Sequence, residues 1–244
     1  MNDNVMLAVE TSTRRGSVAL GRGDAVLGWR ALAAEQPHTT ELLPTIRDLL
    51  AEAGVAPANV GVVAFSQGPG SFTGLRVAAT LARTWQSATG CRVVAVPTLA
   101  VIARNALEHP DRPHRVAVIH DIKRGQLLAA LFERDDVGEY RVVRDAARVE
   151  ATGWLADLPR PCWVAGDGAA TWATTLRDAG LHLLDDEYAR PDARHVLALT
   201  RQRAAAGRSC SPAEIVPLYL RPPECEEVFE RRRAEARQRR EAAS

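Results

Sequence analysis

The 244-residue sequence lacks several features that would point directly to a class of protein. Its four cysteines never stand at CxxC spacing, which argues against both a zinc ribbon and a disulfide framework. No run reaches the ~18 apolar residues of a membrane span, and no charged-then-apolar leader opens the chain. A net charge of +1 provides no overall field toward nucleic acid or membrane. We therefore expect a cytoplasmic protein without a membrane contact.

What is present is typical of a globular protein. The sequence is 46% hydrophobic and 25% charged, and it is long enough for one large domain or two small ones. Prolines and charges interrupt all periodicity between His109 and His114, which marks a boundary. We predict three parts, over residues 1–108, 109–223 and 224–244. The last part is a tail of interleaved acids and arginines, either helical or disordered, and its contact with RNA is left open.

The first part combines strands and helices. Three short apolar runs begin it: Val5–Glu10, Gly16–Gly21 and Ala25–Ala31. The pieces between them are too short for helices, so the runs predict an antiparallel meander. Helix, strand, helix, strand and helix follow at residues 39–53, 60–65, 73–89, 93–96 and 98–107. This order predicts a mixed sheet whose helices come from the crossovers.

The second part restarts in the same way. A strand at Val116–Ile119, a polar turn at Asp121–Gly125 and a hairpin partner at Gln126–Phe132 repeat the opening of the chain. Weaker patterns follow, with strands at 141–144 and 162–165 and helices at 171–179 and 196–206. The repeat suggests a duplicated fold with a less regular second copy.

The stretch Ser66–Gly74, SQGPGSFTG, joins a buried strand to a helix. A glycine turn before a helix directs backbone N–H groups into one concavity, where proteins commonly bind phosphate. A phosphate-binding loop of the GxxxxGK(S/T) type needs a lysine after its last glycine, and here Leu75 and Arg76 follow. A structural turn and a nucleotide site are both open interpretations, and the missing lysine favours the turn.

The helix after this loop has an unusually wide apolar face. Its apolar and small residues span roughly 200° of arc, whereas a helix on one sheet needs a stripe of little over ~100°. The helix is either buried under its own domain or shared with another subunit, and both interpretations stay open.

Six motifs in order carry a resemblance to a known family. They are LAVETSTRRGSVAL (7–20), HTTELLP (38–44), GPGSFTGLR (68–76), VPTL (96–99), DIKRGQLLAAL (121–131) and PLYLR (217–221). The chain resembles the TsaB (YeaZ-like) family of tRNA threonylcarbamoyladenosine biosynthesis proteins, degenerate relatives of TsaD. The resemblance implies the two-lobed, ribonuclease H-like α/β fold of actin, sugar kinases and Hsp70. It implies a mixed sheet with helices on both faces in each lobe, and a smaller, irregular second lobe.

The resemblance also implies that the catalytic parts of TsaD are missing. Thr98 and Ile102 stand where TsaD carries two metal-binding histidines, so we expect no metal and no catalytic residue. The positions that match phosphate-binding turns of related ATPases are degenerate: Glu10, Thr11, Ser12, Gly68, Gly70, Ser71, Thr73, Gly74, Asp121 and Gly125. Carboxylates facing each other across a cleft would suit Mg²⁺. The other interpretation is that these residues cap turns.

By the same resemblance, the chain is a non-catalytic subunit that pairs with TsaD and is joined by the TsaE ATPase. The assembly modifies adenosine 37 of tRNAs that read ANN codons. No cofactor is expected to bind this chain tightly, and ATP with Mg²⁺ at the subunit junction is left open. Pairing would use helices 39–53 and 73–89, through Leu42, Leu43, Ile46, Leu75, Arg76, Ala78, Ala79, Ala82 and Arg83.

Without TsaD, the same surface would form a homodimer. The sequence predicts that Ala79→Arg or Ala82→Arg abolishes pairing while the monomer stays folded. Two alternatives remain: an ATPase or small-molecule kinase of the same fold, and a metallopeptidase-like protein, which the missing histidines disfavour.

Overall fold

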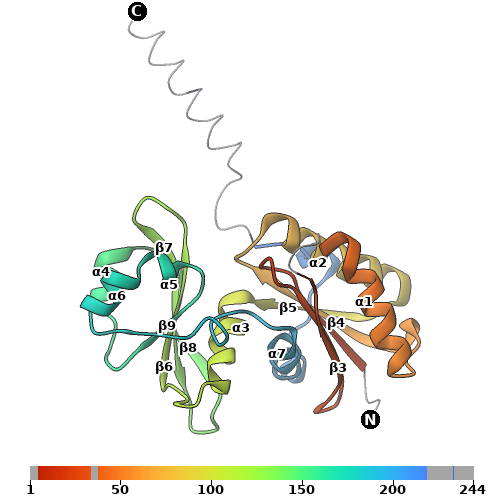
Figure 1. Cartoon of the computed structure of the whole chain (residues 1–244). Helices are drawn as coiled ribbons and strands as arrows, with labels where there is room; N and C mark the ends of the chain where they lie inside the picture. Colours follow the sequence, from red (N-terminus) through yellow and green to blue (C-terminus); the bar gives the residue numbers. More distant parts are fainter. Residues whose placement is uncertain (1–4, 34–37, 219–232, 234–244) are drawn as a thin grey trace, which may run out of the picture.

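The computed structural model describes residues 5–33, 38–218 and Arg233. Figure 1 shows two lobes, each built around one sheet. The strand orders are β3-β2-β1-β4-β5 and β10-β9-β6-β7-β8, so the two sheets share one topology. The mixed α/β fold and its duplication are therefore as the sequence predicts. No helix of the described part is long and apolar enough to cross a membrane.

The first sheet begins as the predicted meander. Its strands are β1 (Val5–Glu10), β2 (Ser17–Arg22), β3 (Ala25–Ala31), β4 (Val60–Gly68) and β5 (Arg92–Pro97). The first three pair antiparallel, whereas β4 lies parallel to both β1 and β5. Strand β1 is buried along its whole length. A strand covered on both faces needs a continuous apolar run, which explains VMLAV at its start.

Helices cover both faces of the first sheet. Alternate residues of β1 point to opposite faces. Leu7 packs in one cluster with α1 (His38–Glu52) and α2 (Phe72–Thr89). Ala8 packs on the other face with α7 (Ala193–Ala205). The sheet is thus the middle layer between the α1–α2 pair and α7.

The second lobe is smaller and less regular, as predicted. Its strands are β6 (Arg115–Asp121), β7 (Gln126–Arg134), β8 (Tyr140–Glu150), β9 (Trp163–Ala165) and β10 (His182–Leu183). Short helices α4 (Ala151–Ala156), α5 (Gly168–Thr171) and α6 (Ala173–Asp178) accompany one face. On the other face lies α3 (Thr98–Asn105), which Figure 1 places between the lobes.

Several element bounds differ from the predictions, three of them as follows. The strand expected at 141–144 extends over Tyr140–Glu150, because exposed polar residues on an edge strand leave no apolar pattern to read. The helix expected at 171–179 is divided at Trp172 into α5 and α6. The helix expected at 98–107 continues beyond α3 only as a 3₁₀ turn, Ala106–Glu108.

The two lobes share elements. Helix α7 follows the second sheet in sequence but packs on the first sheet. After the 3₁₀ turn Pro212–Glu214, the chain returns to α2 and β4, where Leu218 N–H donates to the Gln67 carbonyl at 2.8 Å. The lobe boundaries at 108 and 223 stay predictions, and the expected tail at 224–244 lies outside the described residues apart from Arg233.

Candidate functional site

The glycine loop between β4 and α2 packs directly against the turn after β1. The Ser71 N–H donates to the Ser12 carbonyl at 2.7 Å, and Thr11 Oγ1 donates to the Gly74 carbonyl at 2.8 Å. A Cβ on Gly74 would lie 1.8 Å from the Thr11 carbonyl oxygen, and one on Gly70 would lie 2.4 Å from that of Ser12. Only glycine permits this approach of two backbones.

The start of α2 is capped by its own chain. Ser71 Oγ accepts from Gly74 N–H at 3.3 Å, and the Ser71 N–H is already bonded to Ser12. A phosphate at this loop would find these two backbone donors engaged. The geometry therefore supports the structural turn over a nucleotide site.

Glu10 lies at the centre of the contact between the two turns and is fully buried. One carboxylate oxygen accepts from Ser12 N–H at 2.6 Å and from the Ser12 hydroxyl, and the other accepts from the Ser66 hydroxyl. Burial raises the pKa of Glu10 above its ordinary value, although these donors oppose the shift. A carboxylate with no exposed surface cannot reach a metal ion in a cleft.

The matching turn of the second lobe is formed by Asp121 and Gly125. Asp121 Oδ1 accepts from Lys123 N–H at 2.8 Å, and Oδ2 pairs with Lys123 Nζ at 3.1 Å. Gly125 has a φ of +73°, which glycine adopts without strain. Both residues close the hairpin, in keeping with the interpretation as turn residues.

A cleft of about 420 Å³ lies between the lobes. We call it the interlobe cleft. Ser12, Gly70 and Ser71 line it, whereas Glu10 and Asp121 do not, so the two carboxylates do not face each other across it. Arg14, Arg15 and Arg190 also line it, from the β1–β2 turn and the loop before α7.

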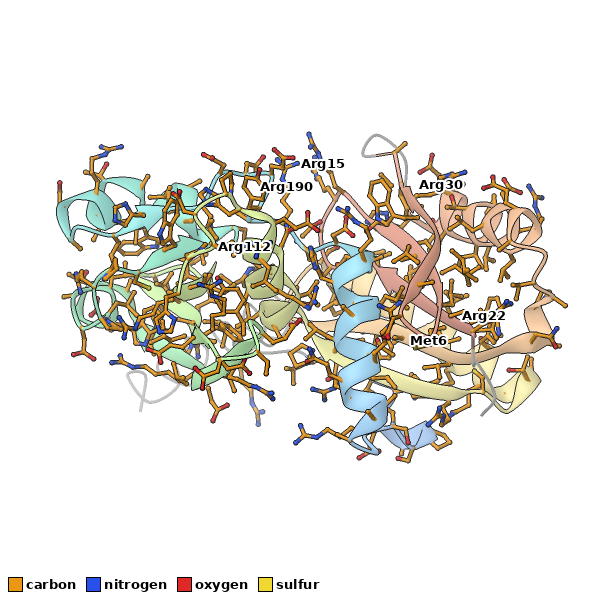
Figure 2. The ribbon with its side chains drawn as sticks, turned by 90° about the horizontal axis from the view of Figure 1, so that it is seen from below. Met6, Arg15, Arg22, Arg30, Arg112 and Arg190 are labelled. Carbon is orange, nitrogen blue, oxygen red and sulfur yellow. The ribbon has the colours of Figure 1, made fainter. Side chains whose placement is uncertain are left out.

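Arg15 and Arg190 lie next to each other at the mouth of the interlobe cleft, from different parts of the chain (Figure 2). Burial and the charge of Arg15 lower the pKa of Arg190. On the opposite wall, His120 Nδ1 lies 2.6 Å from Asp167 Oδ1. The arginines favour an anion near this mouth, but Asp167 and Asp186 offset part of their charge.

Thr98 and Ile102 lie in the same cleft wall. Thr98 Oγ1 is engaged as the acceptor for the Gly68 N–H at 3.1 Å, and the Ile102 side chain has no ligating atom. Among the described residues, no group of three or more His, Cys, Asp or Glu side chains is placed to hold a metal ion.

Most of the predicted interface residues are core residues. Six are buried inside the first lobe or beside the glycine loop: Leu42, Ile46, Leu75, Ala78, Ala79 and Ala82. Leu42 nevertheless lines the surface between the two helices, whereas the other five side chains have almost no exposed area to offer a partner, so the contact surface described next does not include them. Arg83 is exposed, but its guanidinium donates to the Ile215 carbonyl at 3.1 Å and so binds its own chain.

The accessible surface of the two helices is a groove of about 520 Å³, which we call the α1–α2 groove. Leu43 and Phe72 are its exposed apolar side chains, 58% and 41% exposed. The Arg76 guanidinium lies over the Phe72 ring at 3.8 Å. Phe72, Thr80 and Thr84, which sequence reasoning missed, form the wall with Arg76 at a spacing of four residues. This four-residue spacing in the sequence could have shown that the four residues share one face of the helix.

Two lobes with the same five-stranded order, with a cleft between them, define the class of actin, sugar kinases and Hsp70. Residues 32–153, half of the chain, match the family described as "TsaD: tRNA N6-adenosine threonylcarbamoyltransferase". The chain belongs to this family of tRNA threonylcarbamoyladenosine biosynthesis proteins.

Two named relatives and one solved structure match most of the chain. A protein of Escherichia coli named "tRNA threonylcarbamoyladenosine biosynthesis protein TsaB" is 28% identical over 88% of this chain and 94% of its own length. The protein of the same name from Haemophilus influenzae is 28% identical over 91% and 95%. The solved structure "YeaZ from Pseudomonas aeruginosa" is 28% identical, with a TM-score of 0.74 over 89% of this chain and 100% of that chain.

Proposed function

We propose that this chain is a non-catalytic subunit that pairs with a TsaD-type catalytic subunit to make N6-threonylcarbamoyladenosine at position 37 of tRNA. The α1–α2 groove is the observation that carries the proposal. It presents Leu43 and Phe72 to solvent from two rigid helices that are anchored on the first sheet.

The groove has the make-up of an interface centre. Aromatic residues and arginine are over-represented among the residues that dominate binding energy, and here Phe72 and Arg76 are stacked. Threonines surround the apolar centre at Thr39, Thr80 and Thr84. A helix pair from the partner, with an apolar side chain for the groove and a carboxylate for Arg76, would fit this surface. Without TsaD, a second copy would use the same groove.

Three observations favour the role of a non-catalytic subunit over that of a catalytic one. Glu10 is buried in its own turn, the N–H groups of Gly68, Ser71 and Gly74 in the glycine loop are engaged, and Thr98 and Ile102 offer no pair of metal ligands. The chemistry is then left to TsaD, with TsaE as the ATPase of the assembly. We propose no tightly bound cofactor for this chain.

Co-purification with the organism's own TsaD tests the proposal. Leu43→Glu should abolish capture, because it places a charge in the apolar centre of the groove, and Thr80→Arg should weaken it by bulk. Val137→Glu is the matched control, since Val137 is 80% exposed on the second lobe. Capture of all three variants at the level of the unaltered chain would overturn the pairing surface.

An ATPase or small-molecule kinase is the second candidate, and the arginines of the interlobe cleft favour it. Titration calorimetry of the chain alone with ATP and Mg²⁺, followed by a phosphate-release assay, separates the two proposals. Binding with turnover by the isolated chain would favour the kinase-like function. Heat at the baseline and no phosphate release would support the non-catalytic subunit.

A further inference from the structure

The α1–α2 groove is too small to be the whole surface of a stable pair. Ten residues line it, whereas a specific interface buries ~800 Å² of each partner and involves ~20–30 residues a side. A partner that fills the groove must therefore also contact a neighbouring element. The core of an interface is depleted of charged residues, so this element should present an apolar side chain.

Arg83 places the segment of residues 212–218 on the exposed side of α2. It follows Arg76 by seven residues, or about two helical turns, so the two arginines project within ~20° of each other. The Arg83 guanidinium donates to the Ile215 carbonyl at 3.1 Å and to the Pro212 carbonyl at 3.4 Å. The segment therefore lies beside the stripe that lines the α1–α2 groove, and Figure 1 shows it in blue next to α2.

Further hydrogen bonds fix the other end of this segment at the end of β4. The Leu218 N–H donates to the Gln67 carbonyl at 2.8 Å, and Gln67 Nε2 donates to the Val216 carbonyl at 3.2 Å. Ile215 is 2% exposed and packs in the core cluster of the first lobe, whereas Val216 is 44% exposed. The segment thus directs one apolar side chain into the lobe and presents the next one to solvent beside α2.

The surface on the α1 side of the groove is charged instead. Arg47 and Asp48 of α1 are exposed and pair with each other at 2.8 Å. A charged pair is typical of the rim of an interface, whereas an exposed apolar side chain is typical of its core. The apolar contact therefore continues over the 212–218 segment rather than over the outer side of α1.

We propose that the 212–218 segment is a third element of the pairing surface, after α1 and α2, and that Val216 contacts the TsaD-type partner. This inference rests on the proposed function. Arg83 is then a positioning residue, because it holds the segment through two carbonyls of its own chain. A segment that is fixed before binding loses little conformational freedom on association. The apolar surface of the partner that covers Leu43 and Phe72 extends across α2 to Val216.

Capture of the organism's own TsaD by the full-length chain tests the third element. Val216→Asp should weaken binding roughly tenfold or more, because it places a carboxylate in an apolar contact. Val137→Asp is the matched control and should leave the affinity unchanged, since Val137 is 80% exposed on the second lobe. A melting temperature equal to that of the unaltered chain shows that each variant is folded.

The variant Leu43→Glu separates this inference from the proposed function. Loss of capture with Leu43→Glu but not with Val216→Asp would overturn the third element and leave the α1–α2 groove in place. Full capture with both variants would overturn the groove as well. Sedimentation of the chain alone gives a further result: if Val216→Asp dissociates a homodimer while TsaD capture persists, a second copy covers the segment and the proposal fails.

A double-mutant cycle tests the role of Arg83. Arg83→Ala should weaken capture several-fold in the unaltered chain, because the segment loses its hydrogen bonds to α2. It should have no further effect in Val216→Asp, where the contact that Arg83 positions is already lost. Effects that multiply in the double variant would show that Arg83 contacts the partner itself, and would overturn its positioning role.

Discussion

The resemblance to related ATPases predicts a phosphate-binding turn at Glu10, yet the structure surrounds the carboxylate of this residue completely. Three donors from Ser12 and Ser66 meet its two oxygens, and it has no exposed surface. The sequence identifies Glu10 as a candidate but does not show that its carboxylate points into the protein. The turn that encloses it packs on the glycine loop through the hydrogen bond from Thr11 to Gly74, two residues 63 positions apart in the sequence.

The raised pKa of Glu10 predicts a pH dependence of stability. A carboxyl whose pKa is raised by folding stabilises the fold below its unfolded pKa, near 4.5, and loses this contribution as pH rises through the folded value. Glu10→Gln keeps the shape but cannot ionise. Its melting temperature relative to the unaltered protein should therefore increase as pH rises from 4 to 8. Thermal unfolding of both proteins across this range checks the prediction, and a relative loss with rising pH would contradict it.

The faces of helix α2 make different contacts. One face is buried on the sheet through Ala78 and Ala82, and the exposed stripe from Phe72 to Thr84 lines the α1–α2 groove. Arg83 donates hydrogen bonds to the carbonyls of Pro212 and Ile215. The wide apolar arc found in the sequence therefore lies mostly against the helix's own lobe. The helical period shows how wide the apolar face is, but not which other elements cover it.

This division corrects the variants that test pairing. Ala82 is fully buried and Ala79 is 4% exposed, so an arginine at either position has no space and no partner for its charge. Such changes should cost about 3 kcal/mol or more of unfolding free energy. Thr80→Arg, on the exposed side of the same helix, should stay within ~0.5 kcal/mol. Urea denaturation compares them, and equal stability of Ala82→Arg and Thr80→Arg would contradict the packing.

The sequence predicts the position of an element in the fold only where local spacing or an apolar run determines what that element contacts. The opening meander follows from gaps too short for a helix, and the buried strands β1 and β4 follow from continuous apolar runs. The position of α7 does not follow, because an amphipathic stripe does not show which sheet it will cover. Of the residues that line the interlobe cleft, the sequence analysis proposed Ser12, Gly70 and Ser71 as candidate site residues. It did not propose Arg190 and His120, which also line the cleft, because they come from elements distant in sequence.

The two lobes are joined by a partly buried ionic contact besides the chain itself. Arg104 of α3 makes two bonds to Glu139 of the second lobe, at 2.8 and 3.0 Å, and one to His195 Nδ1 of α7 at 3.1 Å. The Arg104 and Glu139 side chains are 19% and 26% exposed. The contact fixes α3 between both sheets, as Figure 1 places it.

Arg104→Ala should therefore destabilise the protein by about 2 kcal/mol, since it removes the arginine that pairs with the Glu139 carboxylate and contacts His195 Nδ1. Arg30→Ala is the matched control. Its pair with Glu52 is at 2.7 Å, but both side chains are more than half exposed, so its loss should cost under ~1 kcal/mol. Chemical denaturation measures both. A larger loss for Arg30→Ala would contradict the assignment of Arg104 as the tie between the lobes.

Whether the whole molecule acts as a partner rather than as an enzyme is tested most directly by reconstitution. Threonylcarbamoyladenosine formation on tRNA would be measured with TsaD and TsaE, with and without this chain, and with Leu43→Glu in its place. We predict modification only when the unaltered chain is present, and none from this chain alone. Modification by the isolated chain, or undiminished modification with Leu43→Glu, would contradict a role that depends on the α1–α2 groove.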